Sequence, residues 1–578
     1  MMAGATSTTR RGVMGLMAAG AAGLAGACTP RGDNALPAGS ISADSLACAE
    51  PLFAVSYSDE QRTQLVRSME GWVTRAEALR AYHKPNALHP AQIFDPRLPD
   101  VPYRAQENVI RNLPGNAGPV PDDATDIAFA PVWKQAAWMA AGQLTSAVLT
   151  DIYLDRIERH GAALECFITV TADRARAEAR ARDAERASGR VRGPLHGIPY
   201  ELKDIVDVAE LPATWGATPY RDRVGEQTAV VARRLEDAGA VLLGKTSVGA
   251  LAYGDIWFDG VCRNPFNPRE GSSGSSAGSA SATSAGLCAF SIGTETLGSI
   301  VSPSHRCGTA GLRPTFGRVA RTGAMALCWT LDKVGPITRH VADTAYVLAA
   351  INGGDAGDPA SFSHGFDCDF ARDLSGLRLG YNPEWLEAAS ELDRQAFEAA
   401  RSLGARPVPF NVDNMPYAAL LIQLEAEAAA AFEELTLSGR DSELRWQDDV
   451  AWPNTFRRAR FISGVDLVNV DRLRRRVMTM MAERMDGLDA VMGPNFAGNM
   501  LLITNYTGHP QLALRAGFEA QRTRTIFGAP ADENEDTFDV PYATSLWAPL
   551  FEEGTLVTLG HAIEQRLGVA ANRPADFS

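Results

Sequence analysis

Serine residues that could act as nucleophiles gather in one stretch of the chain, residues 271–318, together with many glycines. Apolar residues such as Leu287, Phe290 and Ile292 are interleaved with them, whereas a flexible linker would stay polar throughout. Glycine and serine permit tight backbone geometry, so we expect this backbone to be buried and to pass close to another group. A serine attacks a carbonyl only when a base takes its proton and backbone N–H groups hold the oxyanion. The pattern favours an active-site loop over a structural glycine-rich crossing.

One way to use these serines is the nucleophile elbow of α/β-hydrolases. Residues 274–278 match its G-x-S-x-G pattern, with Ser276 as the attacking residue. The elbow must follow a buried strand, but residues 263–270 contain two prolines and several charges, which exclude a central strand. We interpret this match as accidental.

Two lysines are candidates for the base that a serine would need. Lys203 lies in a strand-like run, residues 200–208, directly after a turn rich in glycine and proline. Lys245 lies at the end of residues 240–245, whose apolar run predicts a buried strand. Lysines are mostly exposed, which favours a structural reading on general grounds. The position of Lys203 is nevertheless that of a site residue, whereas we interpret Lys245 as structural.

The order and spacing of four segments resemble the successive boxes of the amidase signature family. These segments are Gly197-Ile198-Pro199 through Lys203-Asp204, Arg263-Asn264-Pro265 to Gly278, Gly293 to Ile300, and Gly311-Leu312-Arg313-Pro314-Thr315. The similarity is strong over residues 132–354 and weak from 493 onwards, and residues 29–125 have no counterpart. The resemblance implies an α/β fold, a three-layer α/β/α sandwich with a large mixed central sheet.

The same resemblance implies a Ser-Ser-Lys triad. Ser299 would be the nucleophile, Ser275 the bridging serine after a cis peptide bond from Gly274, and Lys203 the base. The oxyanion hole would be formed by the backbone N–H groups of Thr296, Leu297, Gly298 and Ser299. No metal and no organic cofactor is required.

Elementary acid–base chemistry limits where such a lysine can lie. An ordinary lysine, with a pKa of about 10.4, is charged at neutral pH and cannot accept a proton. Lys203 must therefore be desolvated and surrounded by hydroxyls rather than carboxylates. Asp204 would oppose this, but adjacent residues on a strand point to opposite faces.

Four positions depart from the family pattern. Leu297 replaces the first glycine of the usual G-G-S, Glu295 replaces an aspartate, and Ser273 replaces the first glycine of G-G-S-S. Oxyanion donation uses the backbone, so Leu297 is tolerated if it avoids a positive φ. Val301 stands where many relatives carry arginine, which favours an uncharged substrate.

Composition excludes several other classes of protein. The chain has 578 residues, 46% of them hydrophobic, and a formal net charge of −14, which is unfavourable for binding nucleic acid or an anionic membrane. There is no C-x-x-C pair and no H-E-x-x-H motif, so we expect no metal site. Seven cysteines remain besides Cys28, and we expect Cys288 and Cys307 to be free and buried. The expected partner is a small-molecule amide substrate.

The N-terminus predicts export. Arg10 and Arg11 precede a short apolar run of alanine and glycine, the pattern of a twin-arginine signal over residues 1–28. Residues 24–28 also resemble a lipoprotein cleavage box, with ordinary cleavage as the alternative; membrane attachment is expected only through a lipid on Cys28. The protein is thus expected in the periplasm or anchored in the cell envelope. Residues 29–125 are interpreted as an N-terminal extension that wraps a main domain, residues 126–578.

Periodicity predicts several elements outside the serine boxes. Residues 59–82, 172–187 and 341–351 have helical patterns, and residues 377–381 and 488–494 have the pattern of buried strands. Residues 505–510 resemble a loop beside the pocket.

Together these features predict an exported serine amidohydrolase that cleaves a carboxylic amide, or an ester or carbamate. Two alternatives have other functions. One is a glutamine-amidotransferase component that acts on charged tRNA, against which the export signal argues. The other is a catalytically inactive binding homologue.

Overall fold

The centre of the molecule is a mixed sheet of 11 strands, seen here in a computed structural model that describes residues 41–112, 114–525 and 536–578. The strand order is β14-β13-β15-β17-β16-β10-β11-β9-β3-β4-β2. The bounds are β2 Phe167–Val170, β3 Pro199–Lys203, β4 Val241–Thr246, β9 Phe290–Glu295, β10 Ala310–Arg313, β11 Lys333–Thr338, β13 Arg378–Tyr381, β14 Arg406–Pro409, β15 Ala490–Pro494, β16 Gln511–Arg522 and β17 Thr537–Trp547. Strand β3 pairs in parallel with β4 and β9, and β13 with β14 and β15, whereas the remaining neighbours are antiparallel.

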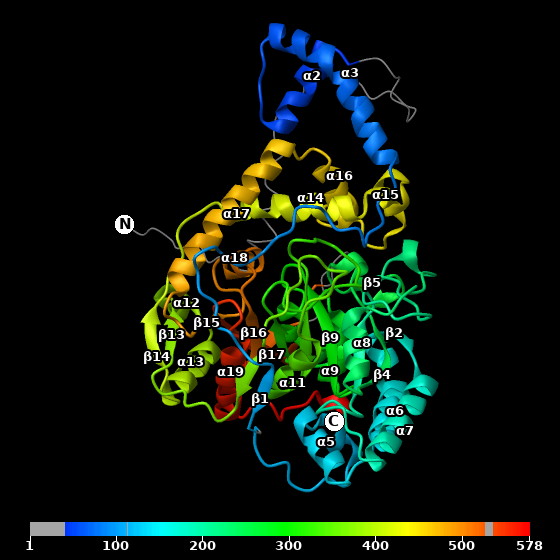
Figure 1. Ribbon diagram of the computed structural model, residues 1–578, viewed down its shortest axis with the longest axis vertical. Helices are drawn as coiled ribbons and strands as arrows, with labels where there is room; N and C mark the ends of the chain where they lie inside the picture. Colours follow the sequence, from blue (N-terminus) through cyan, green and yellow to red (C-terminus); the bar gives the residue numbers. More distant parts are fainter. Residues whose placement is uncertain (1–40, 113, 526–535) are drawn as a thin grey trace.

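Helices cover both faces of this sheet, and the N-terminal helices stand off it (Figure 1). Their bounds are α2 Ala43–Ala49, α3 Asp59–Ala81, α4 Ala124–Phe129, α5 Val132–Ala140, α6 Ser146–Leu164, α7 Ala172–Ala187, α8 Val230–Asp237, α9 Ala277–Ser284, α10 Val301–Cys307, α11 Val341–Ile351, α12 Pro383–Ala388, α13 Glu391–Ser402, α14 Leu421–Ala431, α15 Glu433–Leu437, α16 Trp452–Ala459, α17 Gly464–Met485, α18 Met500–Thr507 and α19 Glu553–Leu567. Helices α9 and α10 pack on one face, and α11 and α19 on the other. This arrangement confirms the predicted α/β/α sandwich with a mixed sheet.

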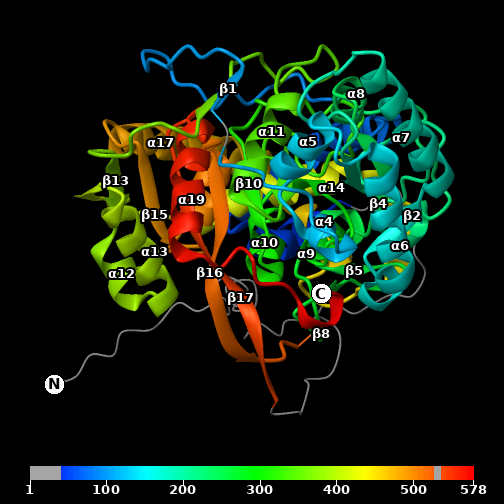
Figure 2. The same cartoon turned by 90° about the horizontal axis from the view of Figure 1, so that it is seen from below.

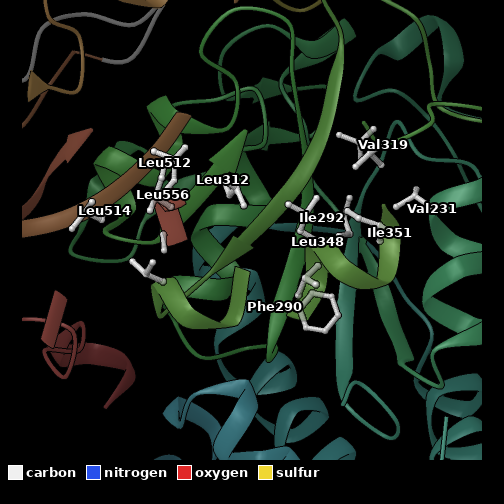
Figure 3. Packing of buried hydrophobic residues seen from close by; sticks show 14 of the residues in the cluster. Val231, Phe290, Ile292, Leu312, Val319, Leu348, Ile351, Leu512, Leu514 and Leu556 are labelled. Atoms are coloured by element: carbon white, nitrogen blue, oxygen red, sulfur yellow. The ribbon is translucent and has the colours of Figure 1, made fainter. Parts of the chain in front are cut away.

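The central strands are apolar because both of their faces are covered. All residues of β3, β4 and β9 are buried, as expected for strands between two helical layers. Figure 3 shows Phe290 and Ile292 of β9 beside Leu348 and Ile351 of α11, and Leu312 of β10 near the helix α19. Lys203 is the last residue of β3 and Ser299 follows β9, so the rigid core positions these two catalytic candidates.

Six short strands of the described chain form three separate two-stranded sheets. They are β1 Val109–Arg111 with β12 Asp367–Asp369, β5 Ile256–Trp257 with β6 Gly260–Val261, and β7 Arg263–Asn264 with β8 Asn267–Gly271. Strand β8 is therefore a hairpin strand outside the central sheet. This agrees with the conclusion that the G-x-S-x-G match at Ser276 is accidental.

The N-terminal part of the described chain has two regions. Helices α2 and α3 stand off the body at the top of Figure 1, and α3 confirms the helix predicted over residues 59–82. The following residues lie along the main domain, where Asn86 exchanges two hydrogen bonds with the backbone of Ala326 and Phe94 packs on Phe316. The predicted export segment with Arg10, Arg11 and Cys28 lies outside the described residues. Among the described helices, none has the length and apolarity needed to cross a membrane.

Most of the other predicted elements are confirmed, and one is wrong. Helices α7 and α11 and strands β13 and β15 occupy the predicted positions. The loop predicted over residues 505–510 begins only at Gly508, because Asn505 and Thr507 belong to α18. Gly508, with a φ of 79°, ends the helix in the left-handed conformation typical of a helix C-terminus. The six buried cysteines of the described chain are free thiols, as predicted for Cys288 and Cys307.

Candidate active site

Lys203, the predicted base, lies at the end of β3 and is completely buried. Its Nζ lies 2.8 Å from Ser275 Oγ, 3.1 Å from Ser276 Oγ and 2.8 Å from Thr294 Oγ1, and it donates to the Thr294 carbonyl over 3.3 Å. All of these partners are neutral. The structure therefore brings Lys203 and Ser275 together, as the resemblance implies.

Burial without a carboxylate in contact makes the Lys203 ammonium group unusually acidic. Burial lowers its pKa to about 7, and the more distant carboxylates of Asp332 and Glu295 only partly oppose this. Asp204, the adjacent acid, turns instead to Lys245, whose Nζ lies 3.0 Å from Asp204 Oδ1, and also accepts from Thr214. Lys245 is thus a structural partner of Asp204, as predicted.

The second segment of the site runs from β8 into α9 and carries the two neighbouring serines. A cis peptide bond joins Gly274 to Ser275, in agreement with the expectation from the family. The hydroxyl of Ser276 donates to the Thr294 carbonyl and accepts from the Thr294 N–H, at 3.0 and 3.1 Å. Both serines contact Lys203, but the hydroxyl of Ser276 is also bonded to the backbone of β9, whereas Ser275 makes the shorter contact with Lys203.

Ser299, the predicted nucleophile, lies in the loop between β9 and α10 and is 7% exposed. The backbone N–H of Ser276 donates to the Ser299 carbonyl over 3.1 Å, so the two serine segments are in direct contact. No hydrogen bond joins the hydroxyls of Ser299 and Ser275, both of which lie within the described residues. Catalytic hydrogen bonds are often long without substrate and tighten in the reacting complex.

Free backbone donors surround Ser299. The N–H groups of residues 296–299 have no acceptor within the described chain, whereas those of Ile300 and Val301 donate to Glu295 Oε2 over 2.9 and 3.1 Å. The positive φ of this loop, 90°, falls on Gly298, and Leu297 has a negative φ. Leu297 therefore meets the condition under which the departure from G-G-S leaves the oxyanion donors intact.

Glu295 holds this loop through a buried polar network that the sequence did not reveal. Its Oε1 accepts from Arg313 Nη1 over 2.8 Å and from Asn505 Nδ2 over 3.0 Å, and both Glu295 and Arg313 are fully buried. Burial alone would raise the pKa of Glu295, but the charge of Arg313 and these hydrogen bonds lower it to about 2. The contact of Thr294 with Lys203 was not predicted either, because nothing in the segment of residues 293–296 distinguishes Thr294 from Thr296.

Ser273 adopts a costly backbone conformation where the family has glycine. Its φ is 65°, in the left-handed region that costs a residue with a side chain about 1–2 kcal/mol and glycine little. The Asp255 carboxylate accepts from its N–H over 2.9 Å, and its hydroxyl lies 2.8 Å from that of Ser302. These contacts hold the backbone in this conformation next to Ser275.

Other features of the described chain do not belong to this site. A groove of about 600 Å³ lies between residues 96–104 of the extension and the end of α17, and none of the three triad candidates lines it. Within the described residues, no group of three His, Cys, Asp or Glu side chains has the geometry of a metal site.

The comparison with protein families decides the family. The family model described as Amidase matches residues 148–557, which is more than half of the chain. The chain belongs to the amidase signature family.

Solved and curated members of this amidase family cover much of the chain. The native peptide amidase from Stenotrophomonas maltophilia has a TM-score of 0.65 and 29% identity, and the match covers 78% of this chain and all of that one. A glutamyl-tRNA(Gln) amidotransferase subunit from Oleidesulfovibrio alaskensis is 30% identical over 491 residues, 75% of this chain and 96% of its own. A protein of the same name from Anaeromyxobacter sp. (strain K) is 36% identical over 310 residues, a match that spans 52% of this chain and 63% of that relative. This amidase is therefore an enzyme of a family that acts on carbon–nitrogen bonds.

Proposed function

We propose that this amidase hydrolyses the C–N bond of an uncharged carboxylic amide through a covalent acyl-enzyme, with Ser299 as nucleophile, Ser275 as bridging serine and Lys203 as base. The observation that carries the proposal is the environment of Lys203. It is fully buried, its contacts are neutral, and its pKa is about 7, so a large fraction is unprotonated at neutral pH. A lysine in this state accepts a proton from Ser275.

Each proton in the proposed reaction has a defined path. Neutral Lys203 takes the proton of Ser275, and Ser275 takes that of Ser299 while Ser299 Oγ bonds to the carbonyl carbon. The carbonyl oxygen becomes an oxyanion that accepts from the free N–H groups of residues 296–299. The C–N bond then breaks, and the leaving nitrogen receives the proton through Ser275. Water attacks the acyl-enzyme by the same route and releases the carboxylic acid.

Two features support an uncharged substrate. Val301 is completely buried and begins α10, so this position offers no cation to a substrate carboxylate. The cations close to the loop are already paired, as Arg313 is with Glu295. Esters and carbamates share the carbonyl chemistry and are included in the proposal.

The test combines a serine probe with an amide panel. We expect a fluorophosphonate to label the wild type and the Ser281→Ala variant, but not Ser299→Ala. Ser281 is the matched control because it is a buried serine of the same stretch whose hydroxyl donates to the Arg263 carbonyl over 2.7 Å. Aryl, alkyl and peptide amides are then assayed for release of the amine. Labelling of Ser299→Ala at the wild-type rate would refute the assignment of the nucleophile, and a wild type that is never labelled would favour the inactive binding homologue.

A second candidate function rests on the names of the curated relatives, which are components of glutamyl-tRNA(Gln) amidotransferases. The net charge of −14 argues against a charged-tRNA substrate, because phosphate contacts require a basic surface. Glutaminase activity that appears only with aminoacyl-tRNA would favour this candidate. Hydrolysis of simple amides without tRNA would favour the first.

We also propose that the enzyme acts in the cell envelope, on the strength of the twin-arginine pattern at Arg10 and Arg11 and of Cys28. Mass spectrometry of the mature N-terminus tests this proposal. Cleavage before a diacylglyceryl-modified Cys28 would support an anchored protein, and an intact N-terminus in the cytoplasm would contradict export.

A further inference from the structure

A buried charge cluster lies directly beside the two serine segments. Glu270, at the end of β8, is completely buried, and Arg306 of α10 is 3% exposed. Arg306 donates from Nε to one carboxylate oxygen of Glu270 and from Nη2 to the other. Such a two-pronged contact fixes the relative orientation of the two groups as well as their distance. Asn264 Nδ2 also donates to Glu270, over 2.9 Å.

The two partners belong to the two segments that must meet for catalysis. Glu270 precedes Ser275 on the same segment, and Arg306 lies on the helix that follows Ser299. Besides this ion pair, the segments are joined by the bond from the Ser276 N–H to the Ser299 carbonyl, by the hydroxyl contact of Ser273 with Ser302, and by the Cys307 thiol, which donates to the Ser272 carbonyl. The ion pair is therefore a further connection, and one between charged groups, that joins the segment of the bridging serine to that of the nucleophile.

A third group ties the ribbon β16–β17 to the same carboxylate. Figure 2 shows this ribbon extending past the rest of the sheet close to β8. Arg524, just after β16, donates its backbone N–H to Glu270 Oε2 over 3.0 Å and Nη2 to the Gly271 carbonyl over 2.7 Å. Arg306 also donates to Gln521 Oε1 over 2.7 Å.

The charges in this cluster are unequal. One buried carboxylate faces two guanidinium groups, so removing its charge leaves the buried Arg306 and the partly exposed Arg524 without their counterion. The surroundings would have to rearrange, and the segments that they connect carry Ser275 and Ser299.

We propose that Glu270 is a positioning residue for the amide hydrolysis. Through Arg306, Glu270 holds the segment of Ser275 at a fixed position relative to that of Ser299, and through Arg524 it connects both segments to the strands β16 and β17. The proposal rests on the proposed serine chemistry, but it concerns a residue that touches neither substrate nor the reacting atoms. The expected signature is a loss in the rate of the chemical step with little change in binding. A merely structural ion pair would lower stability and leave the rate of the folded protein unchanged.

The test compares two buried glutamates. Glu553 of α19 pairs with Arg318 over 2.9 Å, both fully buried, and also accepts from the Thr315 N–H, so Glu553→Gln is a matched loss of a buried ion pair away from the serines. Both variants are labelled with a fluorophosphonate at a temperature where circular dichroism shows them folded, and the maximal labelling rate and half-saturating probe concentration are measured. We expect Glu270→Gln to label about tenfold or more slowly, with half-saturation within about twofold of the wild type, as for a displacement of about 1 Å. Glu553→Gln is expected to label at the wild-type rate.

Equal labelling rates for folded Glu270→Gln and wild type would overturn the proposal, and so would an equal loss of rate in both variants. If Glu270→Gln does not fold, the labelling rate of Arg524→Gln is measured instead. The Arg524 side chain is 29% exposed, so its loss is tolerated more easily. A severalfold slower labelling supports the proposal, and an unchanged rate overturns it. A wild type that is not labelled at all would instead refute the proposed function.

Discussion

The pH dependence of the reaction tests the assignment of the base directly. With a pKa of about 7 for Lys203, about one-tenth of the enzyme has a neutral lysine at pH 6 and about nine-tenths at pH 8. The labelling rate with a fluorophosphonate should therefore rise about tenfold between these two values and level off above pH 8. A lysine with its ordinary pKa of 10.5 would give a tenfold rise for each pH unit up to about pH 10. A rate that keeps rising beyond pH 9, or that does not change with pH, would refute the reasoning.

A substitution at Asp332 shows whether the titrating group is Lys203. After burial, the charge of Asp332 is the next largest influence on the pKa of Lys203, and it raises that pKa. Asp332→Asn should therefore move the acid limb of the rate profile to lower pH. The variant keeps an acceptor for the Thr296 hydroxyl, which donates to Asp332 over 2.6 Å. If the acid limb of the rate profile did not move, the group that titrates would be one other than Lys203.

The same pKa makes a prediction about stability. Between pH 7 and 10.5 the unfolded chain binds a proton at Lys203 that the folded chain has partly or wholly lost, so stability should rise with pH in this window. The cost of burying Lys203 is about 4 kcal/mol at pH 7 and vanishes above pH 10.5. Lys203→Met should thus gain stability relative to the wild type as the pH falls from 10.5 to 7, measured by urea unfolding. A difference between the two proteins that is independent of pH would contradict the lowered pKa.

Three further substitutions probe the other parts of the site. Ser275→Ala should label at least about a hundredfold more slowly than wild type, because it breaks the proton path. A wild-type rate would remove Ser275 from the path. Glu295→Gln should lower the free energy of unfolding, measured by urea titration, by roughly 3 kcal/mol, since Arg313 loses its buried counterion. It should also slow labelling by the serine probe. A wild-type labelling rate would show that the loop does not need this carboxylate. Ser273→Gly should change the free energy of unfolding by less than about 1 kcal/mol, because relief of the positive φ offsets the lost contact with Ser302, and a larger loss would mean that the hydroxyl pair outweighs the strain.

Much of the fold follows from the sequence because the central strands are buried on both faces. Their apolar runs, such as residues 240–245 and 488–494, stand out as strands without any knowledge of their partners. The strand predicted over residues 200–208 ends earlier, at Lys203. The loop predicted at Asn505 failed because polar residues face the buried network around Glu295, so a helix next to a site looks polar where a helix elsewhere would look apolar.

Sequence analysis predicted those site residues whose types suggest a catalytic role, but not the residues that hold them in position. Ser275, Ser299 and Lys203 stand in boxes of recognisable composition, and the structure brings Lys203 to Ser275 and the Ser276 segment to Ser299. The cluster around Glu270 could not be predicted, because its arginines come from segments far apart in the chain and are ordinary surface residues by composition. Only the folded sheet brings them together.

Burial alone does not identify the base of this enzyme. Three lysines are buried in the described chain, Lys203, Lys245 and Lys333. Lys245 is held by the carboxylate of Asp204, and Lys333 donates to the Leu331 carbonyl, with burial lowering its pKa well below the ordinary value. Burial therefore favours the neutral form of Lys333 as well, but no serine hydroxyl among the described residues is bonded to it. The lysine that we propose as the base combines a lowered pKa with a serine hydroxyl at 2.8 Å, and this combination distinguishes Lys203 from the other two buried lysines.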